Sequence, residues 1–261
     1  MHKLQVTVSS FIARVQLSRP EVHHAIDAEL IQNLTETFLT LGKDQNVRVI
    51  VLCSEGKNFC AGADVNWMKN SMQFTKEQNE EDAKNLHQML ETIYRCPKPV
   101  ITRVQGAVFG GGVGLMASSD IAIASREAVF SLSEVRLGIL PAVISTFVLR
   151  KIGMGAFRAY GLSGKRISAE EALRIGLVQE IVSIEDLDQT VDRWIYEFLQ
   201  NGPQAMATLK YLSEEVWHTP SIEKSAEKTV QTIVKTRTGE EGQEGLKAFL
   251  EKRTPTWRIV K

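Results

Sequence analysis

A cluster of glycines near the middle of the chain constrains the fold more than any other feature. The segment Gly106–Gly114 has the sequence GAVFGGGVG and precedes a helix-compatible run, Leu115–Ser119. Each glycine inside a helix costs about 1 kcal/mol relative to alanine, so such a cluster persists only where bare backbone is needed. Two interpretations explain it equally well: a ligand approaches the N–H groups at a helix start, or a strand and a helix pack closely.

A third interpretation of the cluster, a dinucleotide-binding loop, fits the letters but not the context. Gly112, Gly114 and Ala117 have the GxGxxA spacing, and Glu134 follows about twenty residues later. However, Glu134 stands before a turn at Gly138 and does not end the next strand of a βαβ unit. The match is therefore interpreted as accidental.

The apolar residues predict a mixed α/β core followed by a helical tail. We expect a core domain over residues 1–200 and a helical oligomerisation region over 201–261. Strand alternation and helical spacing indicate these elements in order: a hairpin of Leu4–Ser9 and Phe11–Leu17, a helix capped by Asp27, a strand Val47–Leu52, one long helical stretch to about Arg95, strands Val100–Val104, Asp120–Ala124 and Ala128–Phe130, a helix Val143–Ile152, a helix opened by Ser168, and tail helices Thr190–Leu199, Pro203–Trp217, Ser221–Arg237 and Glu240–Arg253.

Composition excludes several classes of function. Lys plus Arg and Asp plus Glu each number 31, so nothing in the net charge favours nucleic acid or an anionic membrane as a partner. The longest apolar stretch, Ile139–Leu149, is shorter than the roughly 20 residues that span a bilayer. The opening sequence MHKLQVTVSS shows no leader pattern, which predicts a cytoplasmic protein. The histidines and cysteines lack metal-ligand spacing, so no metal site is expected.

A second loop rich in small residues, Phe59–Asp64, follows the predicted strand Val47–Leu52. Together with the glycine cluster it suggests two backbone N–H groups directed at one carbonyl oxygen, which is an oxyanion hole. Asp64 is interpreted first as the N-cap of the next helix. Glu134 lies between apolar residues, where a lone Glu is more often paired with a neighbour such as Arg136 than catalytic.

These residues resemble the crotonase, or enoyl-CoA hydratase/isomerase, superfamily over essentially the whole chain. The resemblance is carried by four blocks and two later segments: Leu17–Pro20 with Ala25, Phe59–Asp64, Gln105–Gly112 with Asp120, Glu134–Gly138 with Pro141, Gly164–Ala169 with Gly176–Val178, and the tail Glu244–Arg253.

The resemblance implies an α/β fold, a spiral of ββα units, with a helical C-terminal region that forms homotrimers or dimers of trimers. It implies an acyl-CoA thioester as substrate and no separate cofactor, since coenzyme A is part of the substrate. It also implies a role for each matching position: Glu134 as the catalytic carboxylate; the N–H groups of Ala63 and Gly111 as the oxyanion hole; Ala61, Gly62, Asp64 and Val65 at the adenine; Arg19, Val22 and Ala25 near the pantetheine; Gly110 and Gly114 at the substrate; and Phe249 and Lys252 holding the CoA of a neighbouring subunit.

One position departs from the main hydratases of the family. They carry a first glutamate where this chain has Gly114. The string Ser133–Ser145 is most similar to the branch that hydrates methylglutaconyl-CoA and carboxygeranoyl-CoA, which favours a hydratase acting in fatty acid or branched-chain amino acid degradation. An isomerase that moves the double bond through the same enolate, and a non-catalytic acyl-CoA binder, are the alternatives.

The departure at Gly114 also suggests a substrate. A glycine there is expected to leave space and to remove a negative charge from the wall opposite Glu134. Arg136, two residues from Glu134, is a candidate counter-charge for an acidic acyl chain. We therefore expect a β-branched or carboxylated enoyl-CoA, such as 3-methylglutaconyl-CoA, to be preferred over crotonyl-CoA.

Overall fold

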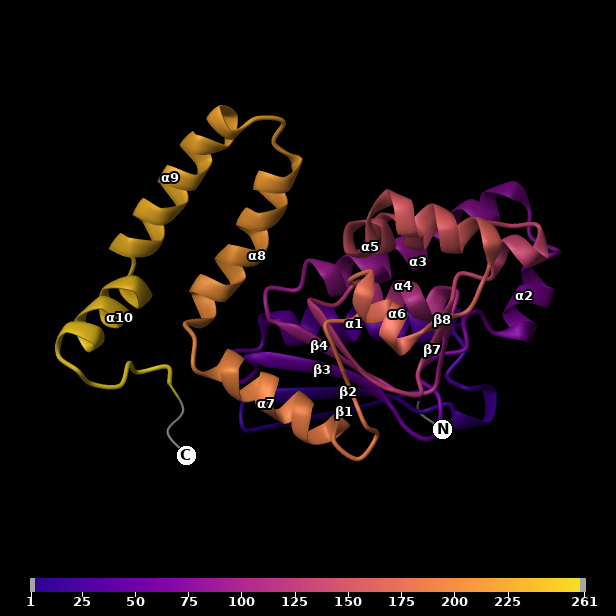
Figure 1. Ribbon diagram of the computed structural model, residues 1–261, viewed down its shortest axis with the longest axis horizontal. Coiled ribbons are helices and arrows are strands. Elements are labelled where there is room, and N and C mark those ends of the chain that lie inside the picture. The colour runs from indigo at the N-terminus through magenta and orange to yellow at the C-terminus, as the bar shows by residue number, and fades with distance from the viewer. Residues whose placement is uncertain (1–2, 259–261) are drawn as a thin grey trace.

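A six-stranded sheet forms the centre of the molecule in the computed structural model, which describes residues 3–258 (Figure 1). Its strand order is β1-β2-β3-β4-β6-β9. The strands are β1 (Leu4–Ser9), β2 (Ile12–Leu17), β3 (Val49–Ser54), β4 (Val100–Val104), β6 (Ile121–Ser125) and β9 (Glu180–Val182). β1 and β2 form the predicted antiparallel hairpin, with Leu4 opposite Leu17, and every later neighbour in the sheet is parallel.

Helices cover both faces of this sheet. On one face, α1 (Ala28–Lys43) and α3 (Lys76–Tyr94) contribute the buried side chains Leu34, Phe38 and Leu90 to the larger core. On the other face, α7 (Leu187–Leu199) packs against alternate residues of β3, including Val49 and Val51. Because β3 is buried on both faces, all six of its residues are buried, as a central parallel strand requires.

A second, three-stranded sheet connects the core to the glycine cluster. It consists of β5 (Ala107–Phe109), β7 (Val129–Ser131) and β8 (Ile167–Ser168), followed by α6 (Ala169–Arg174). β5 was not predicted, and it runs directly into α4 (Gly111–Ala117). The expected helix at Leu115–Ser119 was therefore placed four residues too late, because the glycines themselves form its first turn.

Other boundaries also differ from the sequence expectations. The long helical stretch to Arg95 is two helices, α2 (Val65–Ser71) and α3, because Thr75 and Gln78 form a capping box that starts α3. The helix expected at Val143–Ile152 is longer, α5 (Ala142–Ser163), and is kinked at Gly153. Two short 3-10 helices, η1 (Pro20–Val22) and η2 (Glu134–Leu137), were not predicted.

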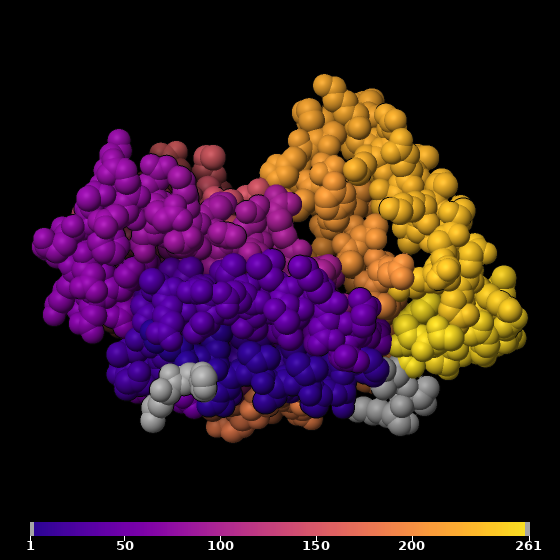
Figure 2. All heavy atoms as spheres, turned by 180° about the vertical axis from the view of Figure 1, so that it is seen from behind, coloured from indigo at the N-terminus to yellow at the C-terminus, as the bar shows by residue number. Residues whose placement is uncertain are grey.

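The tail forms a helical arm beside the core. Its helices are α8 (Pro203–His218), α9 (Ile222–Thr238) and α10 (Glu240–Leu250), the last ending three residues before the predicted Arg253. Figures 1 and 2 show the arm projecting from the end of the molecule opposite α2. No helix within residues 3–258 has the length and apolar character needed to cross a membrane. The division into a core and an oligomerisation region stays a prediction.

Candidate active site

A pocket of about 310 Å³ brings together the two loops and the glutamate singled out by the sequence. Ala63, Gly110, Gly111 and Glu134 all line it. The remaining lining residues come mainly from α2, α3, η2 and the start of α5: Ile26, Trp67, Met68, Ser71, Asn79, Asp82, Leu86, Ser133, Leu137, Ile139, Leu140, Pro141, Ala142, Val143 and Ile144. The wall is largely apolar, which suits a small-molecule site with few polar groups.

The backbone N–H of Ala63 faces away from Ile26, the residue with which Ala63 forms an isolated β-bridge. Ile26 donates from its N to the Gly62 carbonyl oxygen at 2.7 Å, and Asp64 donates from its N to the Ile26 carbonyl oxygen at 2.8 Å. These two bonds use the peptide groups on either side of Ala63, so its own N–H points in the opposite direction. Within the described chain, the Ala63 N–H donates to no protein acceptor.

The second free N–H belongs to Gly111, the first residue of α4. The first N–H groups of a helix have no partner within the helix, and that of Gly111 finds none elsewhere among residues 3–258. Gly110 precedes it with φ at +47°, a conformation that side chains rarely adopt. The φ therefore favours glycine here, and a Cβ at Gly110 would also lie 3.2 Å from Glu134 Oε1 and press on that carboxylate.

Glu134 lines this pocket and has one buried carboxylate oxygen. It is the first residue of η2, and its Oε2 has no hydrogen-bond partner in the described protein. Burial raises the pKa of the Glu134 carboxyl above its ordinary value, against the opposing effect of its own backbone N–H. A carboxyl group with a raised pKa and a free oxygen has the properties of a general acid–base group.

The space expected opposite Glu134 is absent, so that expectation is wrong. A Cβ at Gly114 would lie 2.2 Å from Ile144 Cγ2, so Ile144 from α5 fills the position. Ile144 lines the pocket and Gly114 does not. Gly114 and Gly112 therefore do allow close packing, but of α4 against α5 and against the Phe59–Asp64 loop, where a Cβ at Gly112 would meet the Cys60 carbonyl oxygen at 2.6 Å. The expected contact between a strand and a helix is not what they provide.

Arg136 does not supply the expected counter-charge. It is exposed and does not line the pocket, and its side chain packs against Gly164. The pocket lining contains two carboxyl groups, Glu134 and Asp82, and no Lys or Arg.

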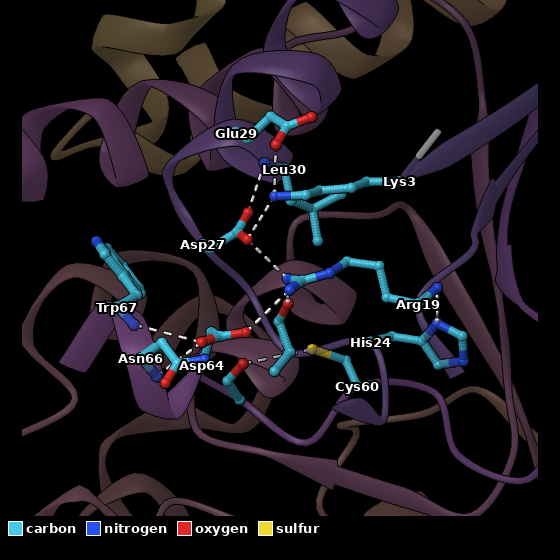
Figure 3. Close-up of polar contacts among 12 residues, drawn as sticks. Lys3, Arg19, His24, Asp27, Glu29, Leu30, Cys60, Asp64, Asn66 and Trp67 are labelled. Atoms are coloured by element: carbon cyan, nitrogen blue, oxygen red, sulfur yellow. Dashed lines mark hydrogen bonds and ion pairs between the residues drawn. The ribbon is translucent and has the colours of Figure 1, made fainter. Parts of the chain in front are cut away.

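Asp64 is the N-cap of α2, as its first interpretation predicted. Its Oδ1 accepts from the backbone N of Asn66 at 2.8 Å and of Trp67 at 3.3 Å. Its Oδ2 accepts from Arg19 Nη2 at 2.9 Å, and Figure 3 shows both residues turned toward each other. The side chains of Arg19 and Asp64 are therefore engaged inside the chain, not free at the pocket.

The other positions that the resemblance links to CoA lie outside the pocket. Gly62 is buried, Val65 is exposed, and Ala25 is held by a hydrogen bond from Arg19 to its carbonyl oxygen. The remaining ones are Val22, Ala61, Phe249 and Lys252. Phe249, in α10, and Lys252, just beyond it, are at the opposite end of the molecule from α2, so they do not reach this pocket within one chain (Figure 1). Their contact with CoA stays a prediction.

The sequence analysis missed Asp82, the second carboxyl group of the pocket. Its Oδ1 accepts from Trp67 Nε1 at 3.0 Å, and burial raises its pKa although that hydrogen bond opposes the rise. A signal was present, because Asn79, Asp82 and Leu86 have helical spacing and so share one face of α3. No group of His, Cys, Asp and Glu suited to a metal ion occurs in the part of the chain that the structure describes.

Comparison with known proteins shows the family and the fold of this chain. Residues 7–259 match the family model described as "Enoyl-CoA hydratase/isomerase". The crystal structure of an enoyl-CoA hydratase from Shewanella pealeana is similar, with a TM-score of 0.95 and 40% identity over 98% of this chain and 96% of that one. An enoyl-CoA hydratase structure from Mycobacterium smegmatis has a TM-score of 0.93 and 29% identity over 98% and 99%. A "Probable enoyl-CoA hydratase" of Bacillus subtilis is 31% identical over 99% of both chains.

Proposed function

Because this chain is an enzyme that belongs to the enoyl-CoA hydratase/isomerase family and has the crotonase fold, we propose that it adds water across the α,β-double bond of an enoyl-CoA thioester. One observation carries the proposal. Ala63 and Gly111, whose backbone N–H groups have no partner in the described chain, line the same pocket as Glu134, whose buried Oε2 is also unpartnered. The pocket thus combines a site for a carbonyl oxygen with a group that transfers protons.

The reaction follows from these groups. The thioester oxygen accepts hydrogen bonds from the N–H groups of Ala63 and Gly111, which stabilise the negative charge that develops on it. The ionised Glu134 takes a proton from water as the water oxygen bonds to Cβ. The resulting enolate takes that proton from Glu134 at Cα, which restores the carboxylate. One carboxyl group is enough for this cycle.

The structure supports an uncharged acyl chain more than the carboxylated one expected from the sequence. Neither the space at Gly114 nor the counter-charge at Arg136 exists in the pocket. An acyl carboxylate would instead meet the like charges of Glu134 and Asp82. We therefore propose a neutral enoyl chain, with β-branching retained from the sequence resemblance, in place of 3-methylglutaconyl-CoA.

A double-bond isomerase is the second candidate, favoured by one observation. Ile144 fills the space beside Gly114 and adds an apolar side chain to the pocket that Glu134 lines, which favours proton movement between two carbon atoms without competing water. In that case Glu134 would take a proton from Cγ and return it to Cα.

A panel of thioesters separates these functions. The absorbance of the conjugated thioester falls on hydration, rises on isomerisation of a β,γ-enoyl-CoA, and stays constant for a non-catalytic binder. Crotonyl-CoA, 3-methylcrotonyl-CoA and 3-methylglutaconyl-CoA test the acyl group, because the last two differ only in a carboxylate. We expect kcat/KM to be at least tenfold higher for 3-methylcrotonyl-CoA than for 3-methylglutaconyl-CoA, about 1.4 kcal/mol. A higher kcat/KM for 3-methylglutaconyl-CoA would contradict the neutral acyl chain and support the carboxylated substrate.

A further inference from the structure

We propose that Arg19 and Asp64 are positioning residues whose ion pair holds the Ala63 N–H in the orientation that binds the thioester oxygen. The inference rests on the proposed function, because it concerns the same carbonyl site. It gives both side chains a role different from the CoA contact that the sequence resemblance implies.

A single guanidinium, that of Arg19, connects the starts of two helices, α1 and α2 (Figure 3). Arg19 Nη2 lies 2.9 Å from Asp64 Oδ2, and Arg19 Nη1 lies 3.0 Å from Asp27 Oδ2. Asp27 is the N-cap of α1 and Asp64 is the N-cap of α2. The Arg19 side chain is only 12% exposed, so this bridge is shielded from solvent competition.

The backbone around Arg19 also holds the loop that carries Ala63. Besides the two bonds made by Ile26, Ala61 donates from its N to the His23 carbonyl oxygen at 3.0 Å. His23 has a positive φ of 51°, which is uncommon for a residue with a side chain. The Arg19 side chain also holds the segment that follows it, residues 20–25, because its Nη1 donates to the Ala25 carbonyl oxygen at 2.6 Å. Loss of the guanidinium would free both the segment and the loop that it supports.

Charge gives a second reason for the pair. Asp64 is 5% exposed and adjacent in sequence to Ala63. Although burial raises the pKa of Asp64, the backbone N–H groups of Asn66 and Trp67 and the Arg19 guanidinium lower it below its ordinary value, so the carboxylate is ionised. An uncompensated carboxylate here would oppose the negative charge of the enolate. Arg19 neutralises it without entering the pocket.

The test measures how strongly the site polarises a bound thioester. A chromophoric α,β-unsaturated thioester such as cinnamoyl-CoA absorbs at longer wavelength when its carbonyl oxygen accepts strong hydrogen bonds. We expect Arg19→Met to lower kcat by about 10²-fold, the cost of a misplaced donor, with KM changed less than about threefold. The red shift of bound cinnamoyl-CoA should shrink in parallel. Arg19→Lys keeps the charge but cannot pair with Asp27 and Asp64 at the same time. Its kcat should therefore lie between that of the wild type and that of Arg19→Met.

Two further variants distinguish positioning from general stability. Arg19→Met/Asp64→Asn removes the unpaired carboxylate and should regain part of the kcat and red shift lost in Arg19→Met. Lys3→Met is the matched control, since Lys3 also pairs with Asp27, at 2.6 Å, but makes no contact with Asp64. It should retain the wild-type kcat and red shift.

The outcomes separate this inference from the proposed function. If the wild-type protein gives neither turnover nor a red shift, the proposed function fails. If the wild type gives both and Arg19→Met or Arg19→Lys keeps both, the inference is overturned. A kcat loss without any change in red shift, or an equal loss in Lys3→Met, would also overturn it, because each indicates a merely structural ion pair. Should Arg19→Met not fold, Arg19→Lys and the isosteric Asp64→Asn carry the test, and we expect both to lose red shift.

Discussion

Ile144 occupies the space into which any side chain at Gly114 would project. A Cβ at position 114 would lie 2.2 Å from Ile144 Cγ2 and 2.6 Å from Ile144 Cβ, closer than such atoms approach in proteins. The residue that replaces the family's first glutamate is thus fixed by packing between α4 and α5. A carboxylate cannot be restored there without moving α5.

Gly114→Ala is therefore expected to destabilise the protein by about 1–3 kcal/mol, because overpacking outweighs the gain of up to about 1 kcal/mol in helix propensity. Gly114→Glu should destabilise it more and restore no activity. The matched control is Gly155→Ala in α5, where a Cβ would meet nothing within 4 Å. Urea unfolding measures all three variants. In Gly114→Ala/Ile144→Ala the cost should be smaller than the sum of the two single costs, and strict additivity would contradict this contact.

Replacing Glu134 by Gln is expected to lower kcat by at least about 10⁴-fold, the upper end of the usual range for a general acid–base group, because Glu134 is the sole proton-transfer group of the proposed cycle. Binding of a saturated acyl-CoA, measured by calorimetry, should be nearly unchanged. Asp82→Asn is the informative comparison, since it alters the other carboxyl group of the same pocket. If Glu134→Gln keeps more than half of the wild-type rate, Glu134 has no part in the chemistry.

Ala63→Pro removes one of the two proposed oxyanion donors and is expected to lower kcat by roughly 10²–10³-fold, the cost of one such donor. Val65→Pro is the control for loop distortion. Val65 is the first residue of α2, a position where proline is well tolerated. If folded Ala63→Pro has the same kcat as Val65→Pro, the Ala63 N–H is not an oxyanion donor. Circular dichroism and matched melting temperatures establish the fold.

The sequence predicted the elements whose pattern is local and missed the contacts made by distant residues. Alternation located the β1–β2 hairpin, and the Asp27 and Asp64 caps were recognised from their own segments. The partner of Gly114 was not predictable, because Ile144 is thirty positions away and reaches it only after α5 folds back. Asp82 had a local signal in its helical spacing, but its hydrogen bond with Trp67 joins it to another helix, α2, and could not be predicted from that spacing. The roles of Ala63 and Gly111 came from a family resemblance and stay proposals.

The exposed apolar side chains of α10 are expected to bind a second copy of the chain, as the family resemblance predicts. Phe249 is 80% exposed and Leu250 is 78% exposed. Phe249→Glu/Leu250→Glu should dissociate the expected trimer or hexamer and weaken CoA binding together, whereas Lys247→Glu on the same helix should do neither. Cutting the chain after Thr238 should act like the double variant. Sedimentation of the double variant as an unchanged oligomer would show that these side chains face solvent in the assembly.

Low pH is expected to destabilise the fold through His24, whose ring accepts a hydrogen bond from the backbone N–H of Arg19. His24 Nδ1 accepts from the Arg19 N at 3.1 Å, and its Nε2 lies 2.8 Å from the Glu55 carbonyl oxygen, so the neutral ring donates there from Nε2. Burial lowers the pKa of His24 below 6.5, although the Glu55 carbonyl and the nearby Glu21 oppose this and His23 adds to it.

The sign of the effect follows from proton binding. The unfolded chain protonates His24 near its ordinary pKa of 6.5, above the value in the folded chain. The contribution of His24 to stability is therefore complete above pH 6.5 and is lost as the pH falls toward the folded pKa. Urea unfolding between pH 7.5 and 5 should show this loss. His24→Asn keeps an acceptor for the Arg19 N–H and tolerates the φ of 56° at this position, but it does not titrate. Its stability should vary less with pH than that of the wild type, and an identical pH dependence in the two proteins would exclude His24 as the source.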